Sequence, residues 1–231
     1  MVMNIAHPIS SVGELIGEPA RTAILIALLD GRDLSAGELA KIAGISPQSA
    51  SAHLSKLVDG ALLTARNHGR HRYYGITGPE VAYALEALGS IATLPRSTAA
   101  IHSREDLDMY RARSCYDHLA GRVAVELTKA LEDSKVILIS GERDYRLGPK
   151  GLIWFADMGI DVDALQRVRR IFARRCLDWT ERKPHLAGAL GAALYSRMLA
   201  AAWITRRPGT RALRITQRGA RELQTRFGFI A

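Results

Sequence analysis

The chain has 231 residues, a formal net charge of +9 and a sequence pI near 9.9, and 48% of its residues are hydrophobic. This apolar content excludes an intrinsically disordered chain, and the two cysteines are too few for a disulfide scaffold. The longest apolar or small run, residues 186–195, is too short to cross a bilayer, and no signal peptide is recognisable at the start, so we expect a soluble, cytoplasmic chain with no membrane partner.

Two helices are predicted between residues 19 and 44. Apolar residues recur at helical spacing at positions 24, 25, 28 and 29, and Asp30-Gly31 ends that segment. Ser35 followed by Glu38 is the pattern of a capping box, which starts a short helix. Gly44 is then expected to end this helix.

A third helix is predicted directly after that glycine. Ser46 is a suitable N-cap and Pro47 suits the first helical position, so the helix runs to about Val58. If Ala50, Leu54, Leu57 and Val58 face the core, the helical wheel turns four residues outward: Gln48, Ala52, Ser55 and Lys56. This small, polar face suits a DNA major groove, where Gln can pair with adenine and Ala can contact a thymine methyl. The two short helices around a tight turn predict a helix-turn-helix.

A β-hairpin is predicted next, with strands at residues 62–66 and 71–76 around a turn that contains His68 and Gly69. Residues 1–95 carry seven Lys or Arg against eight Asp or Glu. Three of those seven lie in the hairpin segment: Arg66, Arg70 and Arg72. Concentrated positive charge beside a helix-turn-helix indicates contact with DNA phosphates.

Residues 12–93 resemble the bacterial winged-helix repressors of the ArsR type. The resemblance rests on four segments taken together: GEPARTAILIALLDG, SAGELAKIAGIS, QSASAHLSKL and GRHRYYGI. It implies a homodimer, formed largely by the first helix and by a helix at about residues 79–93, that binds double-stranded DNA. It also implies that Ser46, Gln48, Ser49, Ser51 and His53 lie at or near the groove, and that Arg70 and Arg72 lie on the wing.

The full set of candidate DNA-binding residues combines both arguments: Ser46, Gln48, Ser49, Ser51, Ala52, His53, Ser55, Lys56, Arg66, His68, Arg70 and Arg72. One departure from the family is clear. Metal-sensing members often carry a cysteine motif in the helix before the recognition helix, whereas this chain has no cysteine before position 115. Sensing at that family site is therefore excluded.

The C-terminal part contains a predicted internal repeat. The phrase HLAG occurs at 118–121 and again at 185–188, and from each copy the chain runs through an apolar helix, two strand-like runs and another helix. We therefore expect a winged helix-turn-helix domain at 1–95, a linker at 96–106, and two winged-helix-like repeats at 107–160 and 161–231, the repeats forming a regulatory module. The expected fold class is mainly α with small β-hairpin wings, an α+β chain.

Cysteine and histidine residues accompany both copies of the phrase. Cys115 and His118, three residues apart on a predicted helix, would share one face, with Asp117 beside them. Cys176, Asp178 and His185 form the second set. If the repeats pack about a pseudo-twofold axis, both sets could hold zinc or another thiophilic metal. Reversible thiol oxidation and a purely structural role in the core are the alternatives.

Two further features of the C-terminal part bear on its function. Residues 96–231 hold 25 Lys or Arg against 15 Asp or Glu, and the arginine-rich segment 167–175 is predicted to be helical, so it could contact DNA, an acidic effector or a partner subunit. Trp154, Phe155, Trp179 and Trp203 could line a pocket for an organic ligand or pack in the core.

These features predict a dimeric, sequence-specific transcriptional repressor. It would bind a pseudo-palindromic operator, with an effector of unknown identity acting at the C-terminal module. An enzyme with metal or thiol chemistry in the C-terminal part is the main alternative, with the winged helix serving only to target it. The basic charge also allows a third class, a protein that coats DNA without sequence preference.

Overall fold

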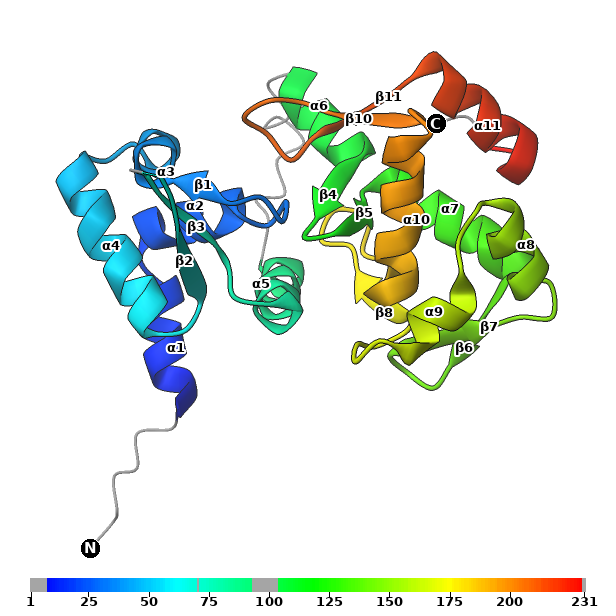
Figure 1. Cartoon of the computed structure of the whole chain (residues 1–231), viewed down its shortest axis with the longest axis horizontal. Coiled ribbons are helices and arrows are strands. Elements are labelled where there is room, and N and C mark those ends of the chain that lie inside the picture. The colour runs from blue at the N-terminus through cyan, green and yellow to red at the C-terminus, as the bar shows by residue number, and fades with distance from the viewer. Residues whose placement is uncertain (1–7, 70, 93–103, 230–231) are drawn as a thin grey trace, which may run out of the picture. The chain divides into compact units, whose positions relative to one another are not determined.

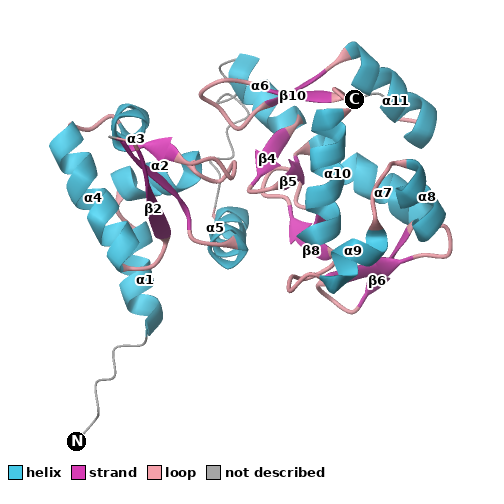
Figure 2. Cartoon of the chain, viewed as in Figure 1, coloured by secondary structure: helices cyan, strands magenta, loops and turns pink. Residues whose placement is uncertain are grey.

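The computed structural model describes residues 8–69, 71–92 and 104–229 (Figure 1). The chain divides into two compact units, one ending at Leu85 and the other starting at Glu86. Helices dominate both units and the sheets are small (Figure 2), which confirms the predicted fold class. Within the described part of the chain, no helix combines the length and apolar character needed to span a membrane.

The N-terminal unit is a winged helix-turn-helix. Its elements in chain order are α1 (Pro8–Ile16), α2 (Pro19–Ala27), β1 (Leu34–Ser35), α3 (Ala36–Ala43), α4 (Pro47–Asp59), β2 (Leu63–His68), β3 (His71–Ile76) and the start of α5 (Pro79–Ile91). The three strands form one antiparallel sheet in the order β1-β3-β2. The hairpin of β2 and β3 is the predicted wing.

Local capping explains why the helix-turn-helix forms where it was predicted. Ser35 and Glu38 make both bonds of the capping box at the start of α3, and Gly44 ends that helix in the left-handed conformation, with φ of 65°. Ser46 then caps α4 by accepting a hydrogen bond from the Ser49 amide at 3.1 Å. Buried leucines and isoleucines of α2, α3 and α4 pack together beneath these caps, so the core holds the two helices at a fixed angle to each other.

The C-terminal unit begins within α5 and contains all the remaining elements. They are α6 (Arg104–Arg111), β4 (Arg113–Cys115), β5 (His118–Ala120), α7 (Arg122–Asp133), β6 (Ile137–Ser140), β7 (Asp144–Leu147), α8 (Gly151–Asp157), α9 (Val162–Arg167), β8 (Arg174–Leu177), β9 (Pro184–Ala187), α10 (Gly188–Ala200), β10 (Ile204–Arg206), β11 (Leu213–Ile215) and α11 (Gln217–Phe227). One continuous core, which includes Leu131, Phe155, Leu190 and Met198, joins these helices and strands.

The same order of elements occurs twice in this unit. A hairpin, a long helix, a second hairpin and a further helix appear as β4-β5-α7-β6-β7-α8 and again as β8-β9-α10-β10-β11-α11. Both long helices begin at or after a glycine with positive φ, Gly121 at 87° and Gly188 at 80°. These parallels support the predicted duplication, and its division at residues 160 and 161 stays a prediction.

The first hairpin of each copy pairs with the second hairpin of the other copy. The Tyr145 amide of β7 donates to the Ala173 carbonyl beside β8, at 2.9 Å, while the Leu213 amide of β11 donates to the Ala112 carbonyl beside β4, at 2.8 Å. The equivalent bonds on the other side run from Arg175 to Arg143 and from Ser114 to Arg211. This reciprocal pairing relates the two copies by an approximate twofold arrangement.

Two predictions about local structure were wrong, and a third, the linker at 96–106, lies mostly outside the described residues. Cys115 and His118 lie on facing strands of a hairpin, not on a helix, because a two-residue turn at Tyr116 and Asp117 reverses the chain and Tyr116 takes a positive φ of 57°. The arginine-rich segment is not one helix, since α9 ends at Arg167 and β8 starts at Arg174. In the expected linker, 96–103 lie outside the described residues and α6 already begins at Arg104.

Candidate DNA-binding surface and buried Cys/His cluster

The outer face of α4 is the candidate recognition surface. Ala50, Leu54 and Leu57 are fully buried, as the helical wheel predicted. The residues expected to face outward or to flank that face are exposed: Gln48, Ser49, Ser51, Ala52, Ser55 and Lys56. The face therefore presents an amide, hydroxyls, a methyl group and one cation, none of them bulky enough to prevent entry into a major groove.

Some candidate residues on α4 also have structural roles within the N-terminal unit. The Ser46 hydroxyl caps the helix, and the Ser51 hydroxyl donates to the Pro47 carbonyl at 3.0 Å. His53 is only partly exposed, with Nδ1 lying 3.5 Å from a carboxylate oxygen of Glu18 and 3.4 Å from a guanidinium nitrogen of Arg21. These contacts connect the flank of α4 to the start of α2, so His53 also has partners within the N-terminal unit.

The wing carries the candidate phosphate contacts. Arg66 is exposed and forms an ion pair with Asp33 at 3.0 Å, and Arg72 on the paired strand lies over the Tyr74 ring with 5.5 Å between the guanidinium carbon and the ring centroid. His68 is exposed and contacts the Tyr73 ring edge-on. Arg70 lies outside the described residues. The hairpin is buried at its base and exposed toward its tip, so its basic side chains remain candidates for contacts with phosphates.

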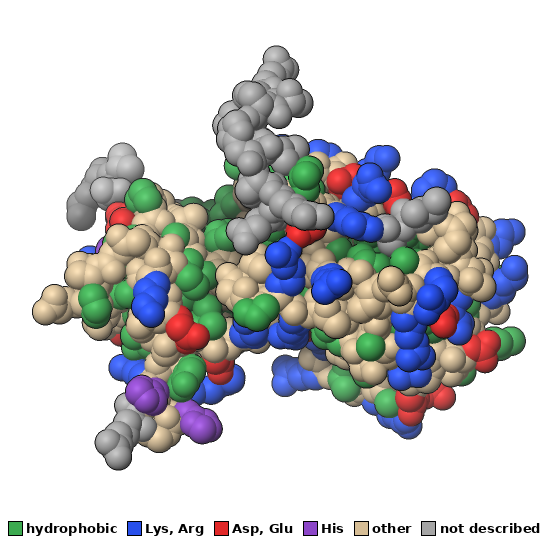
Figure 3. Space-filling view, turned by 90° about the horizontal axis from the view of Figure 1, so that it is seen from above, with side chains coloured by type: hydrophobic (Ala, Val, Ile, Leu, Met, Phe, Trp, Pro, Cys, Tyr) green, Lys and Arg blue, Asp and Glu red, His purple; other side chains and the backbone are tan. Residues whose placement is uncertain are grey.

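Basic side chains are also abundant on the C-terminal unit. Figure 3 shows Lys and Arg side chains over much of the face of this unit that the view presents, with Asp and Glu interspersed among them. Several arginines have partners within the unit, including Arg207 with Asp108 and Arg226 with Glu222. Some of the basic side chains are thus held in local ion pairs, while the net positive charge of residues 96–231 is unchanged by them.

Four side chains of the C-terminal unit form a buried cluster, which we call the Cys/His cluster. Cys115, His118, Cys176 and His185 place one sulfur or nitrogen atom each within 4.8 Å of every other. All four are buried, with exposed fractions between 0 and 7%. In each hairpin the cysteine faces the histidine directly across the strands, Cys115 opposite His118 and Cys176 opposite His185. Opposed residues project on the same side of a sheet, so each hairpin supplies one thiol and one imidazole to a common centre.

The two imidazoles face each other inside the cluster. Their Nε2 atoms are 3.1 Å apart. On the far side of each ring a carboxylate approaches Nδ1: Asp117 lies 3.4 Å from His118, and Asp178 lies 3.4 Å from His185. The Asp117 carboxylate is within hydrogen-bond distance of the His118 Nδ1, whereas the buried His185 Nδ1 makes no hydrogen bond. In both rings the Nε2 atom is the one that faces the cluster.

Asp178 is the centre of a buried hydrogen-bond network. One of its oxygens accepts hydrogen bonds from the Arg113 guanidinium at 2.9 Å and from the Thr180 hydroxyl at 2.6 Å, and the other accepts from the Gly121 amide at 2.7 Å. Arg113 is fully buried and also stacks over the Trp179 ring, 4.7 Å from its centroid. Burial disfavours the charged carboxylate, but the charges of Arg113 and His185 and these hydrogen bonds hold the pKa of Asp178 well below its usual range.

The protonation of the cluster follows from the same contacts. A hydrogen bond to Cys176 and complete burial raise the pKa of the Cys115 thiol. Burial opposes a charged imidazole at His118, but Cys115 and the Asp117 carboxylate raise the pKa of His118 to about 9. Asp117 also pairs with Arg170 at 2.6 Å. Each histidine of the cluster thus has a carboxylate near its Nδ1 atom, and each of these carboxylates is paired with an arginine.

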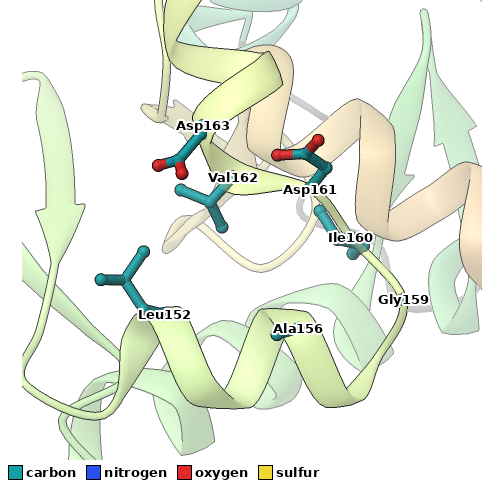
Figure 4. Close-up of a pocket in the computed structure, with 7 residues that line it drawn as sticks. All are labelled: Leu152, Ala156, Gly159, Ile160, Asp161, Val162 and Asp163. Carbon is teal, nitrogen blue, oxygen red and sulfur yellow. The ribbon is translucent and has the colours of Figure 1, made fainter.

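The aromatic residues considered for an organic-ligand pocket have other positions. Phe155 and Trp203 are buried in the core of the C-terminal unit, and Trp154 packs against Phe155 and Phe227. An open cavity of about 470 Å³ lies elsewhere, between α8 and the loop that leads into α9, and Figure 4 shows its lining: Leu152, Ala156, Gly159, Ile160, Asp161, Val162 and Asp163. None of these lining residues is aromatic.

Comparison with known proteins identifies the family. A family model described as "Helix-turn-helix domain" matches residues 16–66. A curated protein of Bacillus subtilis (strain 168), "Uncharacterized HTH-type transcriptional regulator YdfF", is 44% identical over 211 residues, which cover 91% of this chain and 93% of that protein. The chain belongs to the HTH-type transcriptional regulators. The similarity to YdfF runs through both units of this regulator.

Solved structures with some likeness to this regulator include two shorter proteins. One is "the homodimeric winged helix-turn-helix DNA-binding domain" of a possible ArsR-family regulator from Mycobacterium bovis, 31% identical, covering 35% of this chain and 74% of that one, with a TM-score of 0.33. The other is "the cadmium metal-sensor CMTR" of Mycobacterium tuberculosis, 30% identical, covering 41% of this chain and 99% of that one, with a TM-score of 0.32.

Sequence reasoning named all four residues of the Cys/His cluster, and it missed the residues that support them. Arg113 and Arg170, the partners of Asp178 and Asp117, were not singled out as site residues. A signal for Arg113 was present, because the phrase Ala-Arg-x-Cys-x-Asp occurs at 112–117 and again at 173–178. The aspartate of each copy lies near the Nδ1 atom of the histidine in the same copy. An alignment of the two repeats that extended to this phrase would therefore have included Arg113.

Proposed function

We propose that this regulator is a sequence-specific, dimeric transcriptional repressor whose affinity for its operator is modulated by an effector that binds the C-terminal unit. The observation that carries the proposal is the exposed face of α4, whose small polar side chains stand beside a wing with exposed arginines. Two such helices, one from each subunit, would enter successive major grooves of a pseudo-palindromic site, about 34 to 36 Å apart. On this proposal the regulator acts by binding and turns over no substrate.

Homodimer formation has support in the surface of the chain. Helix α1 exposes Ile9 and Val12, and α5 exposes Leu88 and Ile91. Large apolar side chains clustered on a helix surface are typical of a contact with another chain. We therefore propose that α1 and α5 form the contact between the two subunits.

The test is selection of a binding site from random double-stranded DNA by the full chain, followed by affinity measurement at several salt concentrations. A repressor of this kind keeps a large ratio of specific to non-specific affinity, whereas a DNA-coating protein loses it. Gln48→Ala should weaken binding to the selected site by about 1–3 kcal/mol and relax the base preference at one position. Gln224→Ala, at an exposed position of α11, is the matched control and should leave both unchanged.

The direction of regulation needs a second measurement. Transcription in vitro from a promoter carrying the selected site should fall as the regulator is added. An increase in transcript would contradict repression and leave sequence-specific DNA binding intact. Equal affinity for selected and scrambled DNA would contradict the proposal as a whole.

A further inference from the structure

We propose that the Cys/His cluster is a four-coordinate metal site for a divalent thiophilic cation of the zinc class, with Cys115, His118, Cys176 and His185 as its ligands. The inference names the chemical class of ligand that the C-terminal unit takes, and to that extent it rests on the proposed function. The site itself is argued from its own geometry.

The ligand set and its spacing match tetrahedral zinc. Two thiols and two imidazoles are a set found in structural zinc sites, with Zn–S near 2.3 Å and Zn–N about 2.0–2.1 Å, so a tetrahedron would separate two nitrogens by about 3.3 Å. The Nε2 atoms of His118 and His185 are 3.1 Å apart, and all four ligand atoms lie within 4.8 Å of one another. A cation at their centre would need only small side-chain adjustments.

The imidazole orientation calls for a positive charge between the rings. The Nε2 atoms of His118 and His185 face each other at 3.1 Å, and a carboxylate lies behind each ring, Asp117 behind His118 and Asp178 behind His185. Two imidazole nitrogens at that distance need a positive species between them, either a proton or a metal ion. A shared proton would satisfy the two imidazoles alone, whereas a metal ion also accounts for the convergence of both thiols.

Charge balance around the site is favourable once a divalent cation is bound. Two thiolates neutralise the cation, and the two supporting carboxylates are paired with arginines, Asp117 with Arg170 at 2.6 Å and Asp178 with Arg113 at 2.9 Å. The complete group is therefore neutral overall, as a buried site requires. Four protein ligands leave no open coordination position, which is typical of structural zinc and not of catalytic zinc.

The bound metal would connect the two copies of the repeated arrangement. One cysteine and one histidine come from the β4-β5 hairpin, and the other two come from β8-β9. Each of these hairpins also pairs with the second hairpin of the other copy. A metal ion in the cluster would therefore hold the β4-β5 and β8-β9 hairpins together. Metal binding would then be coupled to the stability of the whole C-terminal unit.

The test uses the full chain, purified anaerobically and stripped with a chelator, then titrated with Co²⁺. We expect the visible bands of tetrahedral cobalt and a thiolate-to-cobalt charge-transfer band that saturate at one ion per chain and disappear when Zn²⁺ is added. Cys115→Ser and Cys176→Ser should each weaken binding by at least tenfold and reduce the charge-transfer band. His71→Ala, at an exposed position of the wing, should titrate like the unmodified chain.

A second measurement on the unmodified chain covers the case in which a cysteine variant fails to fold. Zn²⁺ should slow alkylation of both thiols under native conditions by at least tenfold. Thiols that react equally fast with and without Zn²⁺, cobalt bands unchanged in both cysteine variants, or a Cys115–Cys176 disulfide in the anaerobic protein would each overturn the proposal.

Metal binding and DNA binding are measured separately, so their failures can be distinguished. A chain that binds its operator but no metal refutes the metal site and leaves the proposed repressor intact. A chain that binds one Zn²⁺ but shows no preference for any DNA sequence refutes the proposed repressor and leaves the metal site intact.

Discussion

The buried pair of Arg113 and Asp178 is the residue-scale contact on which the C-terminal unit depends most clearly. Both side chains are fully buried, and the removal of one partner from such a pair leaves an uncompensated charge in the core. Asp178→Asn keeps the shape of the side chain and removes its charge. We expect it to lower the free energy of unfolding of the C-terminal unit by about 3–5 kcal/mol.

Denaturant unfolding followed by tryptophan fluorescence measures this effect directly, because all three tryptophans lie in the C-terminal unit. Asp163→Asn is the matched control, since Asp163 is exposed at the edge of the cavity in Figure 4. It should change stability by less than about 0.5 kcal/mol. If the two variants unfold at the same denaturant concentration, the ion pair of Arg113 and Asp178 does not stabilise the C-terminal unit.

At the scale of elements, two glycines determine how α7 and α10 begin. Gly121 and Gly188 both have positive φ, and a Cβ at Gly188 would lie 2.8 Å from the Ile171 carbonyl oxygen, while one at Gly121 would lie 2.9 Å from that of Tyr110. Gly188→Ala and Gly121→Ala should therefore combine the backbone penalty of about 1–2 kcal/mol with a steric clash against main chain.

A variant at Gly141 distinguishes the backbone penalty from the steric clash. Gly141 also has positive φ, at 67°, but a Cβ added at this position would meet no atom within 4 Å. Gly141→Ala should therefore show the backbone penalty alone, and the other two variants should be distinctly less stable in the same tryptophan-monitored unfolding experiment. Equal losses in all three would show that the close approach of the carbonyls can relax.

Some secondary-structure elements could be predicted from the sequence and others could not. Helices α3 and α4 were predicted correctly because their boundaries depend on local signals, Ser35 with Glu38, Gly44, and Ser46 with Pro47. The β4-β5 hairpin was predicted as a helix because a Cys-to-His spacing of three fits one helical turn equally well. Its two short strands pair with each other over three residue pairs, and β4 also pairs with Arg211 and Ala212, nearly a hundred residues away, which no local pattern indicates.

The candidate sites, too, could be predicted where they depend on local pattern and not where they depend on distant contacts. The exposed face of α4 was deduced from one helical period, so its buried and exposed residues agree with the structure. The four cluster residues were identified by residue type and repetition, although the unequal distances of Cys115 and Cys176 from the HLAG phrase argued for a packing role of the histidines. The structure explains the difference by hairpin loops of unequal length, two residues between β4 and β5 and a longer connection between β8 and β9. The contact of Arg170 with Asp117 joins residues distant in sequence and has no signal in the local pattern, whereas Arg113 lies in a repeated phrase that a longer alignment detects.

At the scale of the whole molecule, the proposed repressor requires two copies of the chain, because one recognition helix reads only one half-site. Ile91 on α5 is 75% exposed and Ile9 on α1 is 70% exposed, and we expect both to be covered in the dimer. Ile91→Glu places a charge in that apolar contact, which should shift the chain toward monomer and lower its affinity for a two-half-site operator by at least tenfold.

Sedimentation equilibrium measures the shift in mass, and titration of DNA carrying one or two half-sites measures its consequence. Ile153→Glu is the matched control, since Ile153 on α8 is 71% exposed and has no place in the proposed contact. That variant should remain dimeric and keep its preference for two half-sites. Because Ile91→Glu leaves α4 and the wing unchanged, it should retain its affinity for a single half-site, which separates loss of the dimer from loss of the recognition surface. A monomeric unmodified chain that binds two half-sites no better than one would show that the apolar surfaces of α1 and α5 serve another contact.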